Sequence, residues 1–308
     1  ARDYPLFPNR GFMLDVARKF FTMDYLKQYV KILSFYKMNE FQIHLNDNGF
    51  PQFFGDDWNR TYAAFRLESE RFPGLTAKDG SYSKQEFIDL QRMGLEYGVR
   101  IIPEIDIPAH SLAFAHYKPE IASRKYGMDH LDLYKKETYQ FVDSLLDEYL
   151  SGDNPVFIGD LHIGTDEYNK KEAEQYRYFT DRYLKFVEKY GKNVRMWGGL
   201  KWLPGKTPVK AEGVTVNAWS YDWVDPVVSL QEGYKLINTC DTYLYIVPAA
   251  GYYRDFLDHQ WIYEKWSPWI MNRKQTLPEG TPGVLGGMFA VWNDKCGNGI
   301  SEQDVHLR

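Results

Sequence analysis

Long apolar runs, clusters of basic residues and cysteines are all scarce in this chain of 308 residues. No apolar stretch approaches the roughly 18 residues that a transmembrane helix needs, so we expect no membrane span. The 37 basic residues face 42 acidic ones, and a net charge of −5 without any basic run argues against nucleic acid as a partner. The composition therefore points to a globular domain.

Cysteine is represented only by Cys240 and Cys296, which are too few and too far apart in sequence for a disulfide scaffold or a four-ligand zinc site. We expect two free thiols, with a single bridge between them as the alternative. A metal-dependent hydrolase would need clustered ligands such as His-x-His after its first strand, and here that strand ends in Leu14-Asp-Val-Ala17. The sequence therefore predicts no metal site and no cofactor.

Aromatic residues are the class present in excess: nine Trp, 24 Tyr and 19 Phe make up 17% of the chain. This exceeds what a core needs and indicates flat apolar faces used for stacking. The length is ample for a sizeable core, and no repeat, low-complexity tract or linker divides it, so we predict a single domain over residues 1–308. The sequence opens without a charged and apolar leader, so we expect a chain that is either cytosolic or already processed.

Eight short apolar runs alternate with helical patterns along the chain. This alternation implies parallel pairing with helical crossovers, and eight such units predict an α/β fold of the closed (β/α)8, or TIM, barrel type. A doubly wound sheet is the alternative, but no glycine-rich phosphate loop follows the first strand. The predicted strands cover residues 11–16, 40–45, 99–104, 156–163, 194–197, 214–219, 234–238 and 284–292.

Two long connections, 46–76 and 249–281, are rich in aromatic residues, and connections of this kind usually shape the pocket of a barrel. The sequence stops at Arg308, where an eighth outer helix should begin, so we expect that helix to be lacking or truncated. Ser83-Lys-Gln-Glu86 has the pattern of a capping box that opens a helix. Helices are predicted over 24–36, 83–98 and 171–190.

Two adjacent carboxylates, Asp166 and Glu167, follow the predicted strand 156–163. Active sites of such barrels lie at the carboxyl ends of the strands, and neighbouring acids there repel, so that one tends to hold its proton while the other stays ionised. That arrangement suits acid catalysis on an acetal. The other strands end in a mixture typical of a carbohydrate pocket, where indoles meet the C–H faces of sugars and carboxylates meet their hydroxyls. These residues are His44, Asp47, Asp106, His110, Trp197, Trp219, Tyr243, Tyr245, Trp292 and Asp294.

Four motifs occur in order: Arg10-Gly-Phe-Met-Leu-Asp-Val-Ala-Arg18, Ile43-His-Leu-Asn-Asp47, Pro103-Glu-Ile-Asp-Ile-Pro-Ala-His110 and His162-Ile-Gly-Thr-Asp-Glu167. From about Arg10 to Asp294 the chain resembles glycoside hydrolase family 20, the β-N-acetylhexosaminidases and the related lacto-N-biosidases. The resemblance implies an exo-acting, retaining glycosidase in which the substrate's acetamido group replaces an enzyme nucleophile. The partner would be an oligosaccharide or glycoconjugate with a terminal β-N-acetylhexosamine. Such enzymes are usually exported, so a secreted or cell-surface location is expected, with the cytoplasm as the alternative.

The resemblance assigns roles to individual residues. Glu167 would be the general acid that protonates the glycosidic oxygen, and Asp166 would orient the 2-acetamido group whose oxygen attacks the anomeric carbon to form an oxazolinium. A tyrosine after the seventh strand would hold that oxygen, with Tyr245 preferred over Tyr243. The remaining roles are a relay to Glu167 formed by Asp47 and His110, and sugar contacts from Arg10, His44, Asp106, Trp197, Trp219, Tyr243, Tyr253, Trp292 and Asp294.

Two positions depart from the pattern of members that release a single N-acetylhexosamine. Those members commonly carry Tyr-x-Asp after the seventh strand and Trp-x-Glu after the eighth, whereas this chain has Tyr243-Leu-Tyr245 and Trp292-Asn-Asp294. The alternative is a lacto-N-biosidase, which releases the disaccharide galactosyl-β-1,3-N-acetylglucosamine. A barrel that only binds glycans would be expected to lack a catalytic acid, and here both acids are present. Segments closer to the lacto-N-biosidase branch are Ala64-Phe-Arg-Leu67, Asp129-His-Leu-Asp-Leu133, Tyr245-Ile-Val-Pro248 and Tyr252-Tyr253.

Overall fold

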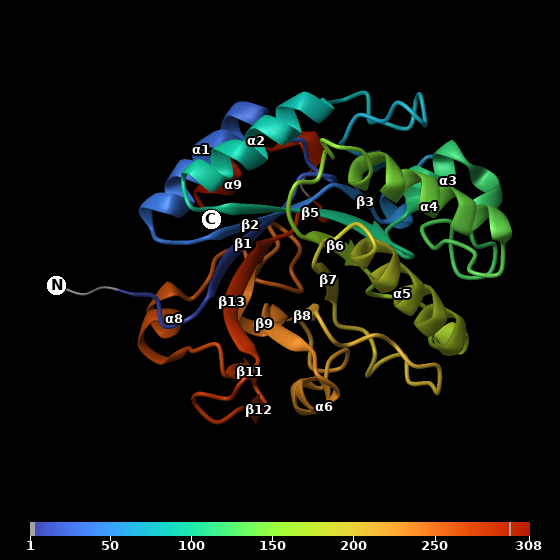
Figure 1. Cartoon of the computed structure of the whole chain (residues 1–308). Coiled ribbons are helices and arrows are strands. Elements are labelled where there is room, and N and C mark those ends of the chain that lie inside the picture. Colours follow the sequence, from blue (N-terminus) through green and yellow to red (C-terminus); the bar gives the residue numbers. More distant parts are fainter. Residues whose placement is uncertain (1–3, 296) are drawn as a thin grey trace.

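The computed structural model, which describes residues 4–295 and 297–308, contains eight parallel strands that close into a barrel (Figure 1). The last strand pairs in parallel with the first, and this pairing closes the sheet. The predicted (β/α)8 architecture is therefore confirmed. In barrel order the strands are β1 (Asn9–Asp15), β2 (Glu40–His44), β5 (Arg100–Ile107), β6 (Leu161–Gly164), β7 (Val194–Trp197), β8 (Val214–Ala218), β9 (Lys235–Asn238) and β13 (Val284–Val291).

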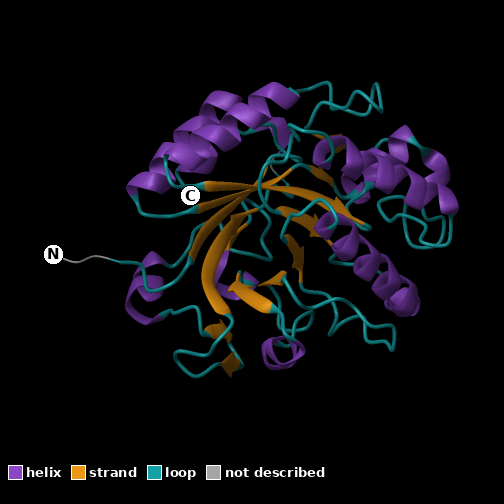
Figure 2. Cartoon of the chain, viewed as in Figure 1, coloured by secondary structure: helices purple, strands orange, loops and turns teal. Residues whose placement is uncertain are grey.

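The helices lie outside the strands (Figure 2). The capping box is confirmed: the Ser83 hydroxyl accepts from the Glu86 amide at 3.1 Å, and the Glu86 carboxylate accepts from the Ser83 amide at 2.9 Å. No helix forms in residues 198–213, which connect β7 to β8, and two outer helices, α4 (Lys136–Leu150) and α6 (Pro226–Glu232), were not predicted. The larger helices are α1 (Met23–Phe35), α2 (Lys84–Glu96), α4 (Lys136–Leu150), α5 (Ala173–Glu188) and α6 (Pro226–Glu232).

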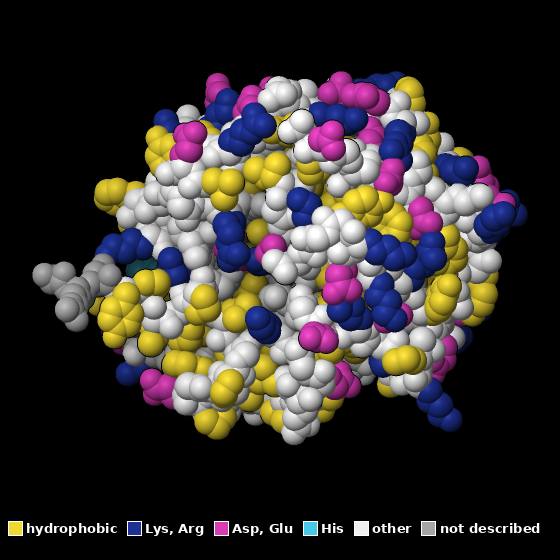
Figure 3. All heavy atoms as spheres, viewed as in Figure 1, with side chains coloured by type: hydrophobic (Ala, Val, Ile, Leu, Met, Phe, Trp, Pro, Cys, Tyr) yellow, Lys and Arg dark blue, Asp and Glu magenta, His cyan; other side chains and the backbone are white. Residues whose placement is uncertain are grey.

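A short helix, α9 (Glu302–His306), follows the last barrel strand. It lies beside α1 (Figure 1), where the Tyr29 hydroxyl is 2.8 Å from His306 Nδ1. Acidic and basic side chains are interspersed on the face shown in Figure 3. Within the residues described, no helix combines the length and apolar character required to cross a bilayer.

The predicted strand 156–163 is shorter in the structure, because only Leu161–Gly164 joins the sheet. The Gln91 side chain of α2 bonds the backbone of the preceding segment: its amide donates to the Val156 carbonyl at 2.7 Å, and its oxygen accepts from the Ile158 amide at 3.0 Å. A side chain thus satisfies backbone groups that a strand neighbour would otherwise pair. The apolar composition of this segment did not reveal whether its backbone groups bond a neighbouring strand or a side chain.

Short elements fill the connections between the barrel strands. The most important is β10, a two-residue strand that pairs with β13 and aligns Tyr245 with Ala290. It therefore carries Tyr245 towards the end of the barrel strand that precedes Trp292. The short elements are β3 (Asn46–Asn48), η1 (Pro51–Phe54), β4 (Ala63–Phe65), α3 (Leu112–Tyr117), η2 (Pro119–Ile121), η3 (Lys170–Glu172), α7 (Asp241–Leu244), β10 (Tyr245–Ile246), α8 (His259–Lys265), β11 (Ile270–Asn272), β12 (Gln275–Thr276) and η4 (Gly297–Gly299).

A buried ion pair crosses the amino-terminal end of the barrel. The Arg195 guanidinium of β7 donates to both carboxylate oxygens of Glu40 at 2.6 and 2.9 Å, and to Asp160 at 2.8 Å. Glu40, at the start of β2, also pairs with Arg100. A buried charge is costly unless it is paired. The contact therefore holds β2 and β7, which are not neighbours in the sheet, in a fixed position relative to each other.

Arg195→Met should lower the free energy of unfolding by about 3 kcal/mol, since it leaves the buried Glu40 carboxylate with fewer partners. Lys185→Met is the matched control, because it removes an exposed cation paired with Asp181 along helix α5 at 2.7 Å. Surface pairs of that kind contribute at most about 0.5 kcal/mol. Urea denaturation followed by circular dichroism measures both values, and equal losses would contradict a structural role for the buried pair.

Candidate active site

A pocket of about 420 Å³ opens at the carboxyl ends of the barrel strands. Its lining comes from loops after β1, β5, β6, β8, β10 and β13, so distant parts of the sequence meet there. Most of the predicted site residues are among them, and Arg18 and Val247 are additions. The lining residues are Arg18, His110, Asp166, Glu167, Trp219, Tyr245, Val247, Tyr253, Trp292 and Asp294.

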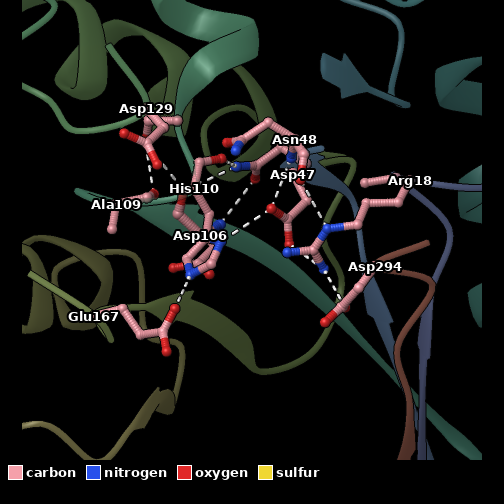
Figure 4. Close-up of polar contacts among 12 residues, drawn as sticks. Arg18, Asp47, Asn48, Asp106, Ala109, His110, Asp129, Glu167 and Asp294 are labelled. Atoms are coloured by element: carbon pink, nitrogen blue, oxygen red, sulfur yellow. Dashed lines mark hydrogen bonds and ion pairs between the residues drawn. The ribbon is translucent and has the colours of Figure 1, made fainter. Parts of the chain in front are cut away.

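Three of the predicted catalytic residues form a continuous chain (Figure 4). His110 Nε2 lies 3.2 Å from Glu167 Oε2, and His110 Nδ1 lies 2.9 Å from Asp47 Oδ1. Burial opposes the charged imidazolium, but the carboxylates of Asp47, Asp166 and Glu167 raise the pKa of His110 well above its usual value. The structure thus brings together the predicted relay.

The state of Glu167 follows from the same contact. Burial would raise the pKa of this carboxyl, but the hydrogen bond and positive charge of His110 outweigh it and lower the pKa. The two pKa shifts thus favour a charged His110 beside an ionised Glu167.

Asp166 lies beside this pair, with Oδ2 3.8 Å from His110 Nε2. Burial, joined by repulsion from Glu167, raises the pKa of Asp166 to about 6 in spite of the charge on His110. Beneath it, burial and the Asp166 charge raise the pKa of Asp106 well above its usual value. The two adjacent carboxyls thus differ in environment, as the sequence predicted. Asp166 has a higher pKa than Glu167.

Asp106 supports the loop instead of lining the pocket, which corrects its predicted contact with sugar. It is 1% exposed, and its Oδ1 accepts from the Thr165 amide at 3.2 Å. A β-carbon on Gly164 would come within 1.7 Å of this oxygen, and the φ of Gly164 is +69°. Only glycine therefore permits the turn that places the two acids above Asp106.

The structure also corrects the predicted sugar-binding arginine. Arg10 lies at the start of β1, at the opposite end of the barrel, where its guanidinium donates to the carbonyls of Lys37 and Phe7, each at 2.6 Å. Arg18 comes after the end of the same strand and lines the pocket. Since catalytic groups of such barrels follow the strands, position in the motif was the signal that favoured Arg18.

Arg18 is surrounded by carboxylates. Its Nη1 lies 3.0 Å from Asp15 Oδ2, 2.8 Å from Asp47 Oδ2 and 3.3 Å from Asp294 Oδ1. Asp294 also accepts from the Tyr252 hydroxyl at 2.6 Å. These contacts place a cation and an acid together on the pocket wall, a combination suited to binding vicinal hydroxyls.

Aromatic rings form the rest of the wall. Trp292 lies with its ring centroid 5.9 Å from that of Tyr245 and 4.9 Å from that of His44. The Trp219 indole donates to the Gly198 carbonyl at 2.8 Å, which fixes its plane at the pocket edge. The Tyr253 hydroxyl donates to Asp241 at 3.1 Å. The pocket therefore offers flat apolar faces beside acids.

Three other predicted contacts lie outside the pocket lining. Trp197 is 1% exposed and donates to Glu104 at 2.6 Å, so it packs below Trp292 instead of forming the wall. His44 is fully buried between Asp47 at 2.7 Å and Glu104 at 3.0 Å, so it supports the relay from below. Tyr243 stacks on Trp261 with ring centroids 4.5 Å apart.

Cys240 is buried after β9, and Cys296 lies outside the residues that the structure describes.

The chain is similar to known glycoside hydrolases. The family model for glycosyl hydrolase family 20, catalytic domain, matches residues 7–303. A β-hexosaminidase of Porphyromonas gingivalis is 26% identical over 266 residues, covering 71% of this chain and 30% of the relative. β-Hexosaminidase subunit B2 of Dictyostelium discoideum is 26% identical over 340 residues, covering 95% and 54%. The chain thus spans about a third to a half of the length of these curated relatives.

Solved structures share the fold at lower sequence identity. The β-N-acetylhexosaminidase of Bacteroides fragilis superposes with a TM-score of 0.74 at 22% identity, over 95% of this chain and 62% of the other. Dispersin B does so with a TM-score of 0.71 at 21% identity, over 93% and 92%.

Asp47→Asn should lower the pKa of His110, because it removes the anion that most strongly raises it. Titration of the His110 ring followed by nuclear magnetic resonance measures the change. Asp153→Asn, which removes an exposed acid from the loop before β6 at the opposite end of the barrel, should leave this titration unmoved. An unchanged His110 titration in Asp47→Asn would contradict the relay.

Proposed function

The chain belongs to glycosyl hydrolase family 20, and from this membership we propose that it is an exo-acting, retaining β-N-acetylhexosaminidase. It would release N-acetylglucosamine or N-acetylgalactosamine from the non-reducing ends of glycans. The single observation that carries the proposal is that His110 joins Asp47 to Glu167 beside Asp166, in a pocket walled by aromatic rings. As part of the proposal, the chain acts on secreted or cell-surface glycans.

In this mechanism Glu167 protonates the glycosidic oxygen. Its side chain is half-exposed, so it can reach a leaving group at the pocket mouth. The proton starts on His110, whose pKa is raised while that of Glu167 is lowered. A sugar that covers Glu167 removes water from the carboxylate and so favours its neutral form, which draws the proton across the 3.2 Å contact. His110 then returns to its charged state when Glu167 later activates water as a base.

Asp166 acts on the substrate's acetamido group. A pKa of about 6 leaves it ionised at neutral pH, and its negative charge then stabilises the cation that develops on the acetamido nitrogen. The acetamido oxygen attacks the anomeric carbon, and the tethered nucleophile avoids much of the entropy cost of a bimolecular step. Tyr245, in the pocket lining, would hold that oxygen, whereas Tyr243 lies outside the lining. No enzyme nucleophile is then required.

Glu167→Gln should lower kcat by about 10²- to 10⁴-fold, the usual contribution of general acid catalysis, while binding of an intermediate analogue persists. Hydrolysis of 4-nitrophenyl β-N-acetylglucosaminide measures the rate, and calorimetry with the N-acetylglucosamine thiazoline measures the binding. Glu264→Gln makes the same change on the exposed helix α8 and should retain full activity. Full activity in purified Glu167→Gln would disprove the acid assignment, and equal affinity for thiazoline and N-acetylglucosamine would argue against acetamido participation.

Release of a disaccharide is the second candidate, and a neighbouring hollow favours it. This hollow of about 860 Å³ shares Arg18 and Asp294 with the pocket. Arg18 and Asp294 lie on the other side of Asp47 from Glu167 in Figure 4, so the hollow lies towards the non-reducing end of a bound sugar. Its further lining includes four aromatic residues that can stack on a second sugar ring: Phe50, Phe53, Phe54 and Tyr62. The other lining residues are Gly49, Ala249, Asn293, Lys295 and Gly297.

Side-by-side hydrolysis of aryl β-N-acetylglucosaminide and aryl β-lacto-N-bioside separates the two candidates. For single-sugar release we expect cleavage of the monosaccharide, with kcat/KM unchanged in Phe54→Ala. Cleavage of the disaccharide alone, falling by up to about tenfold in Phe54→Ala through lost stacking, would replace the first candidate by the second.

A further inference from the structure

The loop that carries the two acids is held in an unfavourable backbone conformation. Thr165 has a φ of +73° and Glu167 a φ of +49°. Non-glycine residues in this region cost about 1–3 kcal/mol each and persist only where surrounding contacts fix them. The positions of Asp166 and Glu167 therefore depend on whatever holds the backbone of this loop.

Each strained residue has its carbonyl bonded by a side chain from outside the loop. The Tyr176 hydroxyl of α5 donates to the Thr165 carbonyl. His130 Nε2 lies 3.2 Å from the Glu167 carbonyl oxygen. The first contact anchors the start of the loop, and the second anchors the residue proposed as the general acid.

His130 belongs to a segment that is itself fixed to the loop after β5. The Leu131 amide donates to the Pro108 carbonyl at 2.8 Å, and the Ser111 amide donates to the Asp129 carbonyl at 2.8 Å. Ser111 directly follows the relay residue His110. The segment thus connects the backbone of Glu167 to the loop that carries His110. The 3.2 Å contact between the side chains of His110 and Glu167 depends on that connection.

The two ring nitrogens of His130 each contact an oxygen atom. Asp129 Oδ1 lies 2.8 Å from Nδ1, and the Glu167 carbonyl lies near Nε2. Both partners are acceptors, so both contacts are hydrogen bonds only when each ring nitrogen carries a proton. The contact with the Asp129 carboxylate orients the ring so that Nε2 faces the Glu167 carbonyl. Asp129 and His130 are largely buried, with side chains 21% and 16% exposed.

We propose that His130, oriented by Asp129, is a positioning residue that fixes the backbone of Glu167 and so aims its carboxyl at both His110 and the glycosidic oxygen. The inference rests on the proposed function of Glu167. It gives a role to the Asp129-His-Leu-Asp-Leu133 segment, which the catalytic relay does not use. Because displacement of a catalytic group by about 1 Å can reduce the rate about 100-fold, loss of this contact should be visible in turnover.

Two variants that differ only in reach provide the test. His130→Gln places an amide donor about where Nε2 lies, whereas the shorter His130→Asn reaches only as far as Nδ1. Each is assayed with the 2,4-dinitrophenyl and the phenyl β-N-acetylglucosaminide. The dinitrophenolate leaves with little help from an acid, whereas phenolate needs it. Thermal unfolding of every variant checks the fold.

We expect His130→Asn to lower kcat/KM for the phenyl substrate by about tenfold or more and to change kcat/KM for the dinitrophenyl substrate by less than about threefold. The ratio kcat/KM reports departure of the leaving group and not the later attack of water, for which both substrates need Glu167 as a base. His130→Gln should recover most of the loss. Asp129→Asn keeps the imidazole ring but removes the charge that orients it. It should lower kcat/KM for the phenyl substrate more than for the dinitrophenyl substrate. If His130→Asn does not fold, this variant provides the test.

Unchanged kcat/KM values, or equal losses of kcat/KM on both substrates, would overturn the positioning role while leaving the proposed function intact. Equal behaviour of the Gln and Asn variants would do the same. A wild-type chain that cleaves neither these substrates nor the lacto-N-bioside would instead overturn the proposed function, and the positioning role with it.

Discussion

The carboxylate of Asp47 joins three segments at the carboxyl ends of the barrel strands. It is fully buried, and it contacts Arg18 from the loop after β1, His44 from β2 and His110 from the loop after β5. Although burial would raise the pKa of Asp47, these cations hold it far below its usual range. A buried anion with several charged partners is stable only while all of them stay in place. Stability and proton transfer therefore depend on the same contacts.

A chain of polar side chains continues from this point into the barrel. His44 lies 3.0 Å from Glu104, which also accepts from Gln42 at 2.7 Å and from the Trp197 indole at 2.6 Å. Burial alone would raise the pKa of Glu104, yet these partners hold it at about 2. A hydrogen-bonded cluster of polar side chains around Glu104 thus lies inside the barrel. Such a cluster restricts strand register, because each donor must meet its acceptor.

The pocket combines shared and individual features of its family. The relay and the acid pair follow the family motifs, whereas Asp294 and Tyr245 stand where single-sugar enzymes commonly carry a glutamate and an aspartate. Asp294 is held by Arg18 and by the Tyr252 hydroxyl, so the shorter acid still faces the pocket. The neighbouring hollow begins at these same residues. Under the proposed function, substrate length would be determined at the boundary between pocket and hollow, not at the acids.

The sequence by itself determined the features that rest on local pattern. Alternating apolar runs identified the eight barrel strands to within a few residues, apart from the shorter β6 and the longer β5, and Ser83 to Glu86 marked a helix start, because periodicity and capping are properties of neighbouring residues. Strand ends, together with the family motifs, identified His110, Asp166 and Glu167 of the pocket and Asp47 buried behind His110, because parallel strands deliver their carboxyl ends to one face.

Only the tertiary structure decided which of the other side chains reach that face. Arg10 and Arg18 belong to one motif, but a strand separates them, so they lie at opposite ends of the barrel. Trp197 and His44 end strands as predicted, yet both are buried by neighbours that are distant in sequence. The location of the proton shared by His110 and Glu167 likewise follows from charges that meet only after folding, since the pKa values of both residues depend on through-space partners.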